Sequence, residues 1–85
     1  MKIELFYNPT CHVCPIAKKM VAKVVKKYPQ VTYEELNAFE HQERVLSLGF
    51  QMVPAIVIDD EVWHAGGLPD KKALKKEIKS RLAKG

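Results

Sequence analysis

The residues of this chain best suited to chemistry are its two cysteines, Cys11 and Cys14, which are separated only by His12 and Val13. Side chains three positions apart are neighbours on a helical turn, close to the separation that a disulfide bond requires. A disulfide stabilises a fold mainly by restricting long loops of the unfolded chain, so a bond across so short a span is a poor structural link. We interpret the pair as a redox-active disulfide and as the active site.

The thiolate is the reactive form of cysteine, and a positive environment raises its population at neutral pH. If a helix begins at Cys11, the thiolate lies against unsatisfied backbone N–H groups and the positive end of the helix dipole. His12 could add to this effect when protonated, and the alternative is that His12 is simply an exposed imidazole. We therefore name Cys11 and Cys14 as catalytic residues and His12 as a candidate for tuning the reactive thiol.

Length and composition bound the possible classes of protein. The chain has 85 residues, of which 47% are hydrophobic and 28% charged, as in ordinary globular domains. We expect a single domain over residues 1–85 that acts as a monomer. No segment approaches the roughly 18 apolar residues of a membrane span, and the start of the chain does not resemble a secretory signal, so we expect a cytoplasmic protein without membrane contact.

The net charge of +4 comes largely from lysines on the polar sides of two predicted helices. A solvated helix face is the simpler explanation, and a surface for nucleic acid or an acidic partner is the alternative. No base-stacking aromatic motif or glycine-rich phosphate loop accompanies these lysines, so we expect no nucleic-acid partner. The lysines concerned are Lys18, Lys19, Lys23, Lys26, Lys27, Lys71, Lys72, Lys75, Lys76, Lys79 and Lys84.

A predicted strand and a predicted helix flank the cysteines. Residues 3–7 form a short, mostly apolar run that ends at Asn8-Pro9, which indicates a buried strand that delivers the chain to Cys11. Residues 15–27 carry apolar side chains at helical spacing, which predicts a helix. Pro15 lies in its opening turns and lacks an N–H, so we expect an irregular first turn.

A second strand and helix follow. Residues 31–36 are a strand candidate, and the segment from Asn37 to Glu40 resembles a capping box that opens a helix running to about Leu48. Gly49 is expected to end this helix because glycine tolerates a left-handed conformation.

The last third of the chain predicts a hairpin and a final helix. Residues 54–58 and 61–65 are strand candidates joined by a tight turn at Asp59-Asp60. Pro69 can start a helix, whose apolar stripe comprises Leu74, Ile78 and Leu82. The order is therefore βαβαββα, an α/β fold in which the first two strands are parallel, the last two antiparallel, and helices cover both faces of one sheet.

This element order, together with three local motifs, resembles the thioredoxin and glutaredoxin superfamily. The motifs are the Cys-x-x-Cys after the first strand, Met52-Val53-Pro54 before the third and Gly66-Gly67 after the fourth. The chain is most similar to the small, glutaredoxin-sized thioredoxin-like proteins of archaea and bacteria, over essentially its whole length. The resemblance implies the thioredoxin fold, a four-stranded mixed sheet flanked by three helices.

The resemblance also implies residue roles and a reaction. Cys11 is expected to be the exposed nucleophile, Cys14 the more buried resolving thiol, and Val53-Pro54 a cis peptide bond beside them. The Val53 backbone can then pair with an extended substrate segment. The implied reaction is thiol-disulfide exchange on protein disulfides, with an unidentified reductase as partner and no cofactor besides the Cys11-Cys14 disulfide. The candidate substrate-binding residues are Met52, Val53, Pro54, Gly66 and Gly67.

The chain departs from both branches of the superfamily. Thioredoxins carry a buried Asp on the strand before the motif, where this chain has Leu5, so a proton acceptor for Cys14 is missing or comes from elsewhere. The run Gly66-Gly67-Leu68-Pro69-Asp70 fits the Gly-Gly-x-x-Asp with which glutaredoxins help to hold glutathione, but Asn8, Val13 and Met52 do not fit the other glutathione positions. A glutathione-dependent oxidoreductase, with glutathione as electron donor, is the alternative function.

Two further classes of function remain as alternatives. Cys11 and Cys14 supply two thiolates, whereas tetrahedral zinc or an iron-sulfur cluster normally takes four ligands, so a metal-binding module would need histidines or a second chain. A redox-inert adaptor that binds peptides in the same groove is the other class, and the two intact cysteines argue against it.

Overall fold

The computed structural model describes residues 1–84 and has the element order that the sequence predicts. Its elements are β1 (Lys2–Tyr7), α1 (Cys14–Val25), β2 (Thr32–Asn37), α2 (Gln42–Leu48), β3 (Ala55–Ile58), β4 (Glu61–Ala65) and α3 (Lys71–Lys84). The structure ends the first predicted helix two residues early and shifts the second strand by one, differences typical of element ends that fray. No helix within residues 1–84 is both long and apolar enough to cross a membrane.

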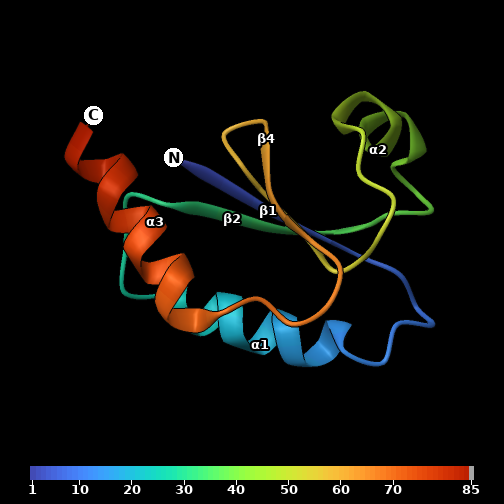
Figure 1. Ribbon diagram of the computed structural model, residues 1–85, viewed down its shortest axis with the longest axis horizontal. Helices are drawn as coiled ribbons and strands as arrows, with labels where there is room; N and C mark the ends of the chain where they lie inside the picture. The colour runs from blue at the N-terminus through green and yellow to red at the C-terminus, as the bar shows by residue number, and fades with distance from the viewer. Residues whose placement is uncertain (85) are drawn as a thin grey trace.

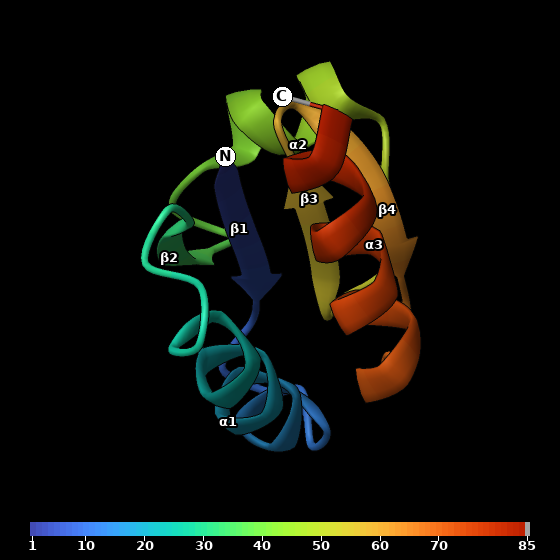
Figure 2. The ribbon, with the colours of Figure 1, turned by 90° about the vertical axis from the view of Figure 1, so that its left-hand side faces the viewer.

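The four strands form one mixed sheet in the order β2-β1-β3-β4. β1 pairs in parallel with β2 and antiparallel with β3, and β3 pairs antiparallel with β4, as predicted. Figures 1 and 2 show α1 and α3 on one face of the sheet and α2 on the other. Residues 3–6 of the central strand β1 are all buried, because this strand is covered on both faces.

Each face of the sheet has its own apolar core. Toward α1 and α3, a fully buried cluster comprises Ile3, Leu5, Ala17, Val21, Val24, Ile56, Ile58, Leu74 and Ile78, with Leu82 partly buried against it. Toward α2, the buried cluster comprises Phe6, Phe50, Ala55 and Val57, and the rings of Phe6 and Phe50 lie 5.1 Å apart. The alternation along β1 follows from the period of two in a strand, which places successive side chains on opposite faces.

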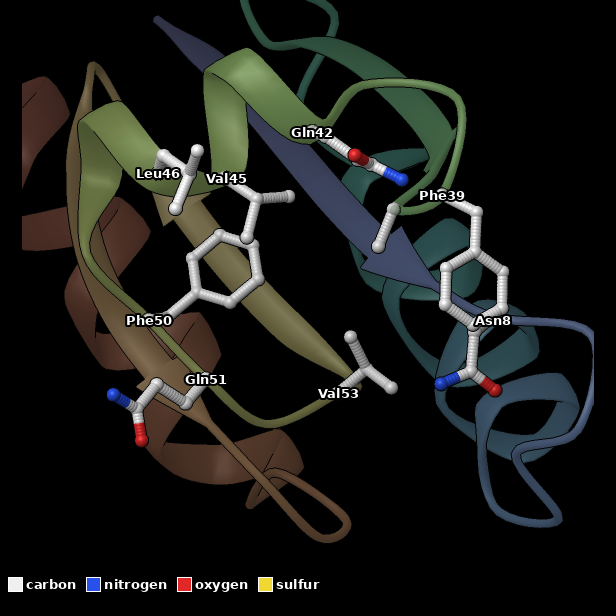
Figure 3. A pocket seen from close by; sticks show the side chains of 9 residues that line it. Asn8, Phe39, Gln42, Val45, Leu46, Phe50, Gln51 and Val53 are labelled. Atoms are coloured by element: carbon white, nitrogen blue, oxygen red, sulfur yellow. The ribbon is translucent and has the colours of Figure 1, made fainter.

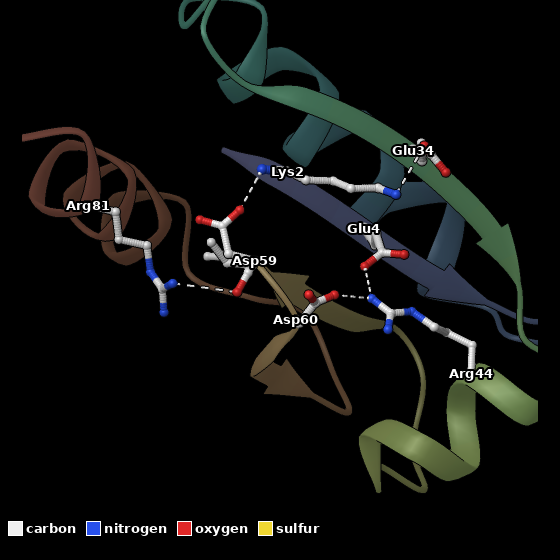
Figure 4. Close-up of polar contacts among 8 residues, drawn as sticks. Lys2, Glu4, Glu34, Arg44, Asp59, Asp60 and Arg81 are labelled. Carbon is white, nitrogen blue, oxygen red and sulfur yellow. Dashed lines mark hydrogen bonds and ion pairs between the residues drawn. The ribbon is translucent and has the colours of Figure 1, made fainter. Parts of the chain in front are cut away.

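A buried ion pair connects α2 to the sheet. Glu4 points to the α2 side of β1 and is only 3% exposed, and its carboxylate accepts a hydrogen bond of 2.7 Å from Arg44 on α2. Arg44 also contacts Asp60 in the β3–β4 turn (Figure 4). Hydrogen bonds from Arg44 to Glu4 and then to Asp60 raise the pKa of this guanidinium. α2 itself has no fully buried residue, and besides the ion pair it packs on the sheet through the partly buried Val45 and Leu48.

The predicted capping box at Asn37 is wrong. Asn37 is the last residue of β2, where it pairs with Tyr7 of β1. Its side-chain oxygen accepts a hydrogen bond of 2.9 Å from the backbone N–H of Phe39, two residues on, which closes a turn at the end of the strand. α2 begins only at Gln42, after His41, without a side-chain cap.

The start of the last helix also differs from the prediction. α3 begins at Lys71 rather than at Pro69, because the carboxylate of Asp70 accepts a hydrogen bond of 2.9 Å from the backbone N–H of Lys72. A carboxylate in this position accepts a hydrogen bond from a free N–H of the first turn and thereby fixes the residue at which the helix begins.

The remaining turns are as predicted. Asp59 and Asp60 both have positive φ, 47° and 68°, which is the geometry of a two-residue hairpin turn. Gly49 ends α2 with φ 85°.

Candidate active site

Cys11 lies in the loop between β1 and α1, so the condition that a helix begins at Cys11 is not met. α1 begins at Cys14, with Val13 as its N-cap. Pro15 fixes this start, because a proline is favourable in the first turn of a helix, whereas in a helix begun at Cys11 it would leave the carbonyl of Cys11 without a donor. The loop is held by Asn8, whose side-chain oxygen accepts hydrogen bonds of 3.0 and 2.9 Å from the backbone N–H and hydroxyl of Thr10.

The two cysteines form a disulfide bond, and their Cα atoms lie 5.4 Å apart. Cys14 is 1% exposed, whereas Cys11 is partly exposed at the surface. The pair therefore presents one sulfur to solvent and keeps the other inside. His12 is exposed in the same loop, and its tuning role stays a prediction.

The segment before β3 lies directly against Cys11. The Sγ atom of Cys11 is 4.0 Å from the carbonyl oxygen of Val53. The Val53-Pro54 peptide bond is cis, as the resemblance implied. Cys11 and Val53 are 42 positions apart in the sequence and meet here because β1 and β3 are neighbours in the sheet.

Gly66 completes the wall beside this segment. Its N–H donates a hydrogen bond of 3.0 Å to the carbonyl of Pro54, and its φ is 86°. A Cβ atom at Gly66 would come within 3.1 Å of the Met52 side chain, so only glycine lets Met52 pack so closely. Gly67 has φ 72°, and its carbonyl oxygen lies 3.0 Å from the Nε2 atom of His64. The structure thus places Val53 against Cys11 and brings Met52, Pro54 and Gly66 into contact beside it, whereas Gly67 contacts His64.

An apolar groove of about 380 Å³ begins at Val53 and continues along α2 (Figure 3). Phe39 is 60% exposed and Leu46 79% exposed, so both present apolar surface to solvent. The sequence does not predict this groove, because an aromatic residue such as Phe39 can equally be core or groove wall and Leu46 carries no signal of its own. The lining includes Asn8, Phe39, Val45, Leu46, Phe50 and Val53.

Further ligands for a metal are not gathered around the cysteines. Within residues 1–84, no group of three or more His, Cys, Asp and Glu side chains is arranged to hold a metal ion.

Comparison with known proteins decides the family. The model of the thioredoxin domain family matches residues 1–79. The chain belongs to the thioredoxin family. A thioredoxin of Methanocaldococcus jannaschii is 41% identical over 83 residues, which cover 96% of both chains. A probable thioredoxin of Archaeoglobus fulgidus is 36% identical over 78 residues, covering 91% of this chain and 85% of the relative.

Solved structures agree on the fold. Thioredoxin 1 of Thermosipho africanus superposes with a TM-score of 0.79 at 20% identity, covering 98% of this chain and 96% of that one. A mutant thioredoxin of Halobacterium salinarum gives a TM-score of 0.76 at 26% identity, covering 93% and 72%. The thioredoxin fold and the superfamily predicted from the sequence are confirmed.

Family membership and the bonded cysteines establish a thiol-disulfide oxidoreductase, as predicted. Thioredoxins act on protein disulfides together with a reductase, and they need no cofactor beyond the redox-active disulfide. The comparisons support this function over the glutathione-dependent alternative.

Proposed function

We propose that this member of the thioredoxin family reduces protein disulfides, with Cys11 as the attacking thiol and Cys14 as the resolving thiol. The difference in burial between the two sulfurs carries the proposal. An attacking sulfur must reach a disulfide of another protein, and Cys11 is partly exposed while Cys14 is 1% exposed. A buried thiol is protected from outside disulfides and reacts only with its bonded neighbour.

The reaction transfers two electrons in two exchange steps. The Cys11 thiolate attacks one sulfur of the substrate disulfide, a mixed disulfide forms, and the other substrate sulfur leaves with the electron pair of the broken bond. The Cys14 thiolate then attacks the Sγ atom of Cys11 and releases the second substrate sulfur as a thiolate. The product is the Cys11-Cys14 disulfide, which a partner reductase returns to the dithiol by supplying two electrons.

The surface next to Cys11 suits an extended polypeptide. The carbonyl of Val53 lies 4.0 Å from Sγ, where it could accept a backbone hydrogen bond from a substrate strand. The apolar groove that starts at Val53 could take an apolar substrate side chain, with Phe39 and Leu46 forming its open sides. Met52 and Gly66 would border the same strand on the other side. Substrate choice would then depend on shape and backbone more than on sequence.

Reduction of insulin disulfides by dithiothreitol tests this function. We expect the wild-type protein, as a monomer, to accelerate the reaction, and Cys11→Ser to abolish the acceleration. Cys14→Ser should form the mixed disulfide without turning over. Equal loss of mixed-disulfide formation in both single variants would contradict the assignment of roles.

Glutathione is the donor to be tested as an alternative. Equilibration of the protein with glutathione redox buffers, followed by thiol alkylation and mass spectrometry, separates the two donors. We expect the Cys11-Cys14 pair to cycle between dithiol and disulfide with little glutathione adduct. Abundant adduct on Cys11 would favour the glutathione-dependent alternative. A cytoplasmic location stays a prediction, which cell fractionation would check.

A further inference from the structure

Reduction of the disulfide turns Cys14 into a buried thiol, and the described residues place no buried carboxylate on its side of the sheet. Among residues 1–83 the one buried charged side chain is Glu4, which points to the α2 side of the sheet and is bound by Arg44. Leu5, on the face of β1 toward α1, is fully buried in the apolar core. Apolar burial disfavours a thiolate, because the charged form loses its solvation. A thiolate at Cys14 can be stabilised by the free N–H groups at the start of α1, where Cys14 is the first residue, and by a positive charge nearby.

Lys18 is placed to provide that charge. It follows Cys14 by four residues on α1, and side chains four apart lie on the same face of a helix. Helical side chains lean toward the N-terminus, so Lys18 covers the turn that begins with Cys14. Lys18 is only partly exposed, whereas its neighbour Lys19 is exposed.

Tyr7 fixes the Lys18 ammonium group. The Nζ atom lies 3.3 Å from the centre of the Tyr7 ring, a cation-π contact. Tyr7 is the last residue of β1 and packs against the core that faces α1, so its ring is itself held in place. Lys18 forms no ion pair with another residue of the described chain, and its positive charge is therefore not neutralised by a neighbouring acid.

Three other titratable groups on this side of the sheet, Glu35, Tyr33 and His64, have hydrogen-bond partners of their own. Glu35, which pairs with Leu5 across β1 and β2, is exposed and accepts a hydrogen bond of 2.9 Å from the Tyr33 hydroxyl. Burial, with Glu35 adding to it, raises the pKa of Tyr33, so this phenol keeps its proton and continues to donate. His64 on β4 contacts the Gly67 carbonyl at 3.0 Å.

At the start of α3, the carboxylate of Asp70 accepts the N–H of Lys72 and is occupied as a helix cap. His12 is exposed in the loop before α1, and Lys75 of α3 lies near Lys27, beyond the other end of α1. Lys18 is the lysine whose position on α1 covers the turn of Cys14.

We propose that Lys18, held by Tyr7, is a positioning cation that stabilises the Cys14 thiolate for the resolving step. The inference rests on the proposed role of Cys14. In that step Cys14 supplies the electron pair of the new bond to Cys11, and the substrate sulfur leaves with the pair of the bond that breaks. The proton of the Cys14 thiol passes to solvent beforehand, and Lys18 keeps its own proton throughout.

Titration of Cys14 by thiolate absorbance in a Cys11→Ser background tests this inference directly. Removing the charge in Lys18→Met should raise the titration midpoint of Cys14 by about one pH unit, which lowers the thiolate fraction at neutral pH about tenfold. Lys18→Arg should keep the midpoint, because it keeps the charge. Tyr7→Leu should raise the midpoint by a smaller amount, since the ammonium group is then no longer held. The matched control Lys19→Met should leave it unchanged.

The two-cysteine protein gives a second readout. With Lys18→Met, release of a peptide from its mixed disulfide with Cys11 should slow about tenfold at pH 7, in proportion to the smaller thiolate fraction. Formation of the mixed disulfide should keep its rate.

Two results would overturn the inference. One is an unchanged Cys14 midpoint in Lys18→Met that is folded by circular dichroism, and the other is an equal rise in Lys19→Met. Either result would leave the proposed function intact as long as the wild-type protein reduces insulin. Absence of that activity in the wild-type protein would instead refute the proposed function itself.

Discussion

Replacing Arg44 with methionine tests whether one ion pair holds α2 on the sheet. The side chain of Glu4 is 5% exposed and that of Arg44 34% exposed, with 2.7 Å between the charged atoms. Removing one partner of a buried ion pair costs roughly 3–5 kcal/mol, because the other charge stays buried and unpaired. Water can partly replace the half-exposed guanidinium, so we expect a loss of about 2–3 kcal/mol in the free energy of unfolding at pH 7. For a domain of this size the thermal midpoint should fall by about 10–20 °C.

Two matched variants separate the buried contact from the exposed one. The carboxylate of Asp60 also contacts Arg44, but its side chain is 79% exposed. Asp60→Asn should therefore cost less than about 1 kcal/mol, as exposed ion pairs do. Combining Glu4→Gln with Arg44→Met removes both buried charges and should recover most of the stability lost in Arg44→Met alone.

Unfolding in guanidinium chloride at pH 7, followed by Trp63 fluorescence, measures these differences in stability. A loss below about 1 kcal/mol in Arg44→Met would refute the reasoning.

Three further predictions follow from single contacts. Gly66→Ala should lower the rate of insulin reduction, because the new Cβ atom would lie 3.1 Å from the Met52 side chain on a backbone with φ 86°. The control Gly49→Ala places its Cβ atom in open space and should only lower the free energy of unfolding by about 1 kcal/mol. Phe39→Ser should raise the KM for insulin several-fold while kcat and the thermal midpoint stay within error, since the exposed ring contributes to the groove and little to the core. Repulsion from Lys27, then from Lys71, lowers the pKa of Lys75, so Lys75→Gln should raise the thermal midpoint at low salt. That gain should shrink in about 1 M salt and disappear above the pH at which Lys75 loses its charge.

The apolar spacing predicted the type and order of the elements, because each strand or helix must bury one side. The run over residues 3–7 is nearly continuous, as expected of a strand covered on both faces, and β1 is such a strand. The spacing of Leu74 and Ile78 likewise predicted the buried side of α3. The motif pair of Cys11 and Pro54 could be recognised because both residues stand at fixed places in the predicted element order, after the first strand and before the third.

Element starts could not be predicted from local chemistry alone. Asn37 and Asp70 are both suited to capping a helix, and only Asp70 does so. Asn37 is instead occupied by its pairing with Tyr7 on β1, a contact between segments far apart in the chain. Tertiary pairing thus decides which N–H groups are left for a side chain to cap.

Two contacts made by charged side chains also could not be predicted from the sequence. Glu4 and Arg44 are 40 residues apart, and neither residue type indicates a buried partner. Lys18 belongs to a helix rich in lysines, and only the position of Tyr7 at the end of β1 distinguishes it from Lys19. Contacts of this kind depend on how helices and strands pack, which apolar spacing leaves open.

Trapping of the mixed disulfide tests the central claim most directly. The Cys14→Ser variant, reduced and mixed with insulin or a disulfide-linked peptide, is analysed by mass spectrometry without reductant. We predict a stable adduct of one substrate chain on Cys11, and no adduct on Cys14 in the matched Cys11→Ser variant. An adduct that forms on Cys14 as readily as on Cys11, or on neither, would contradict the account of an exposed attacking thiol resolved by a buried one.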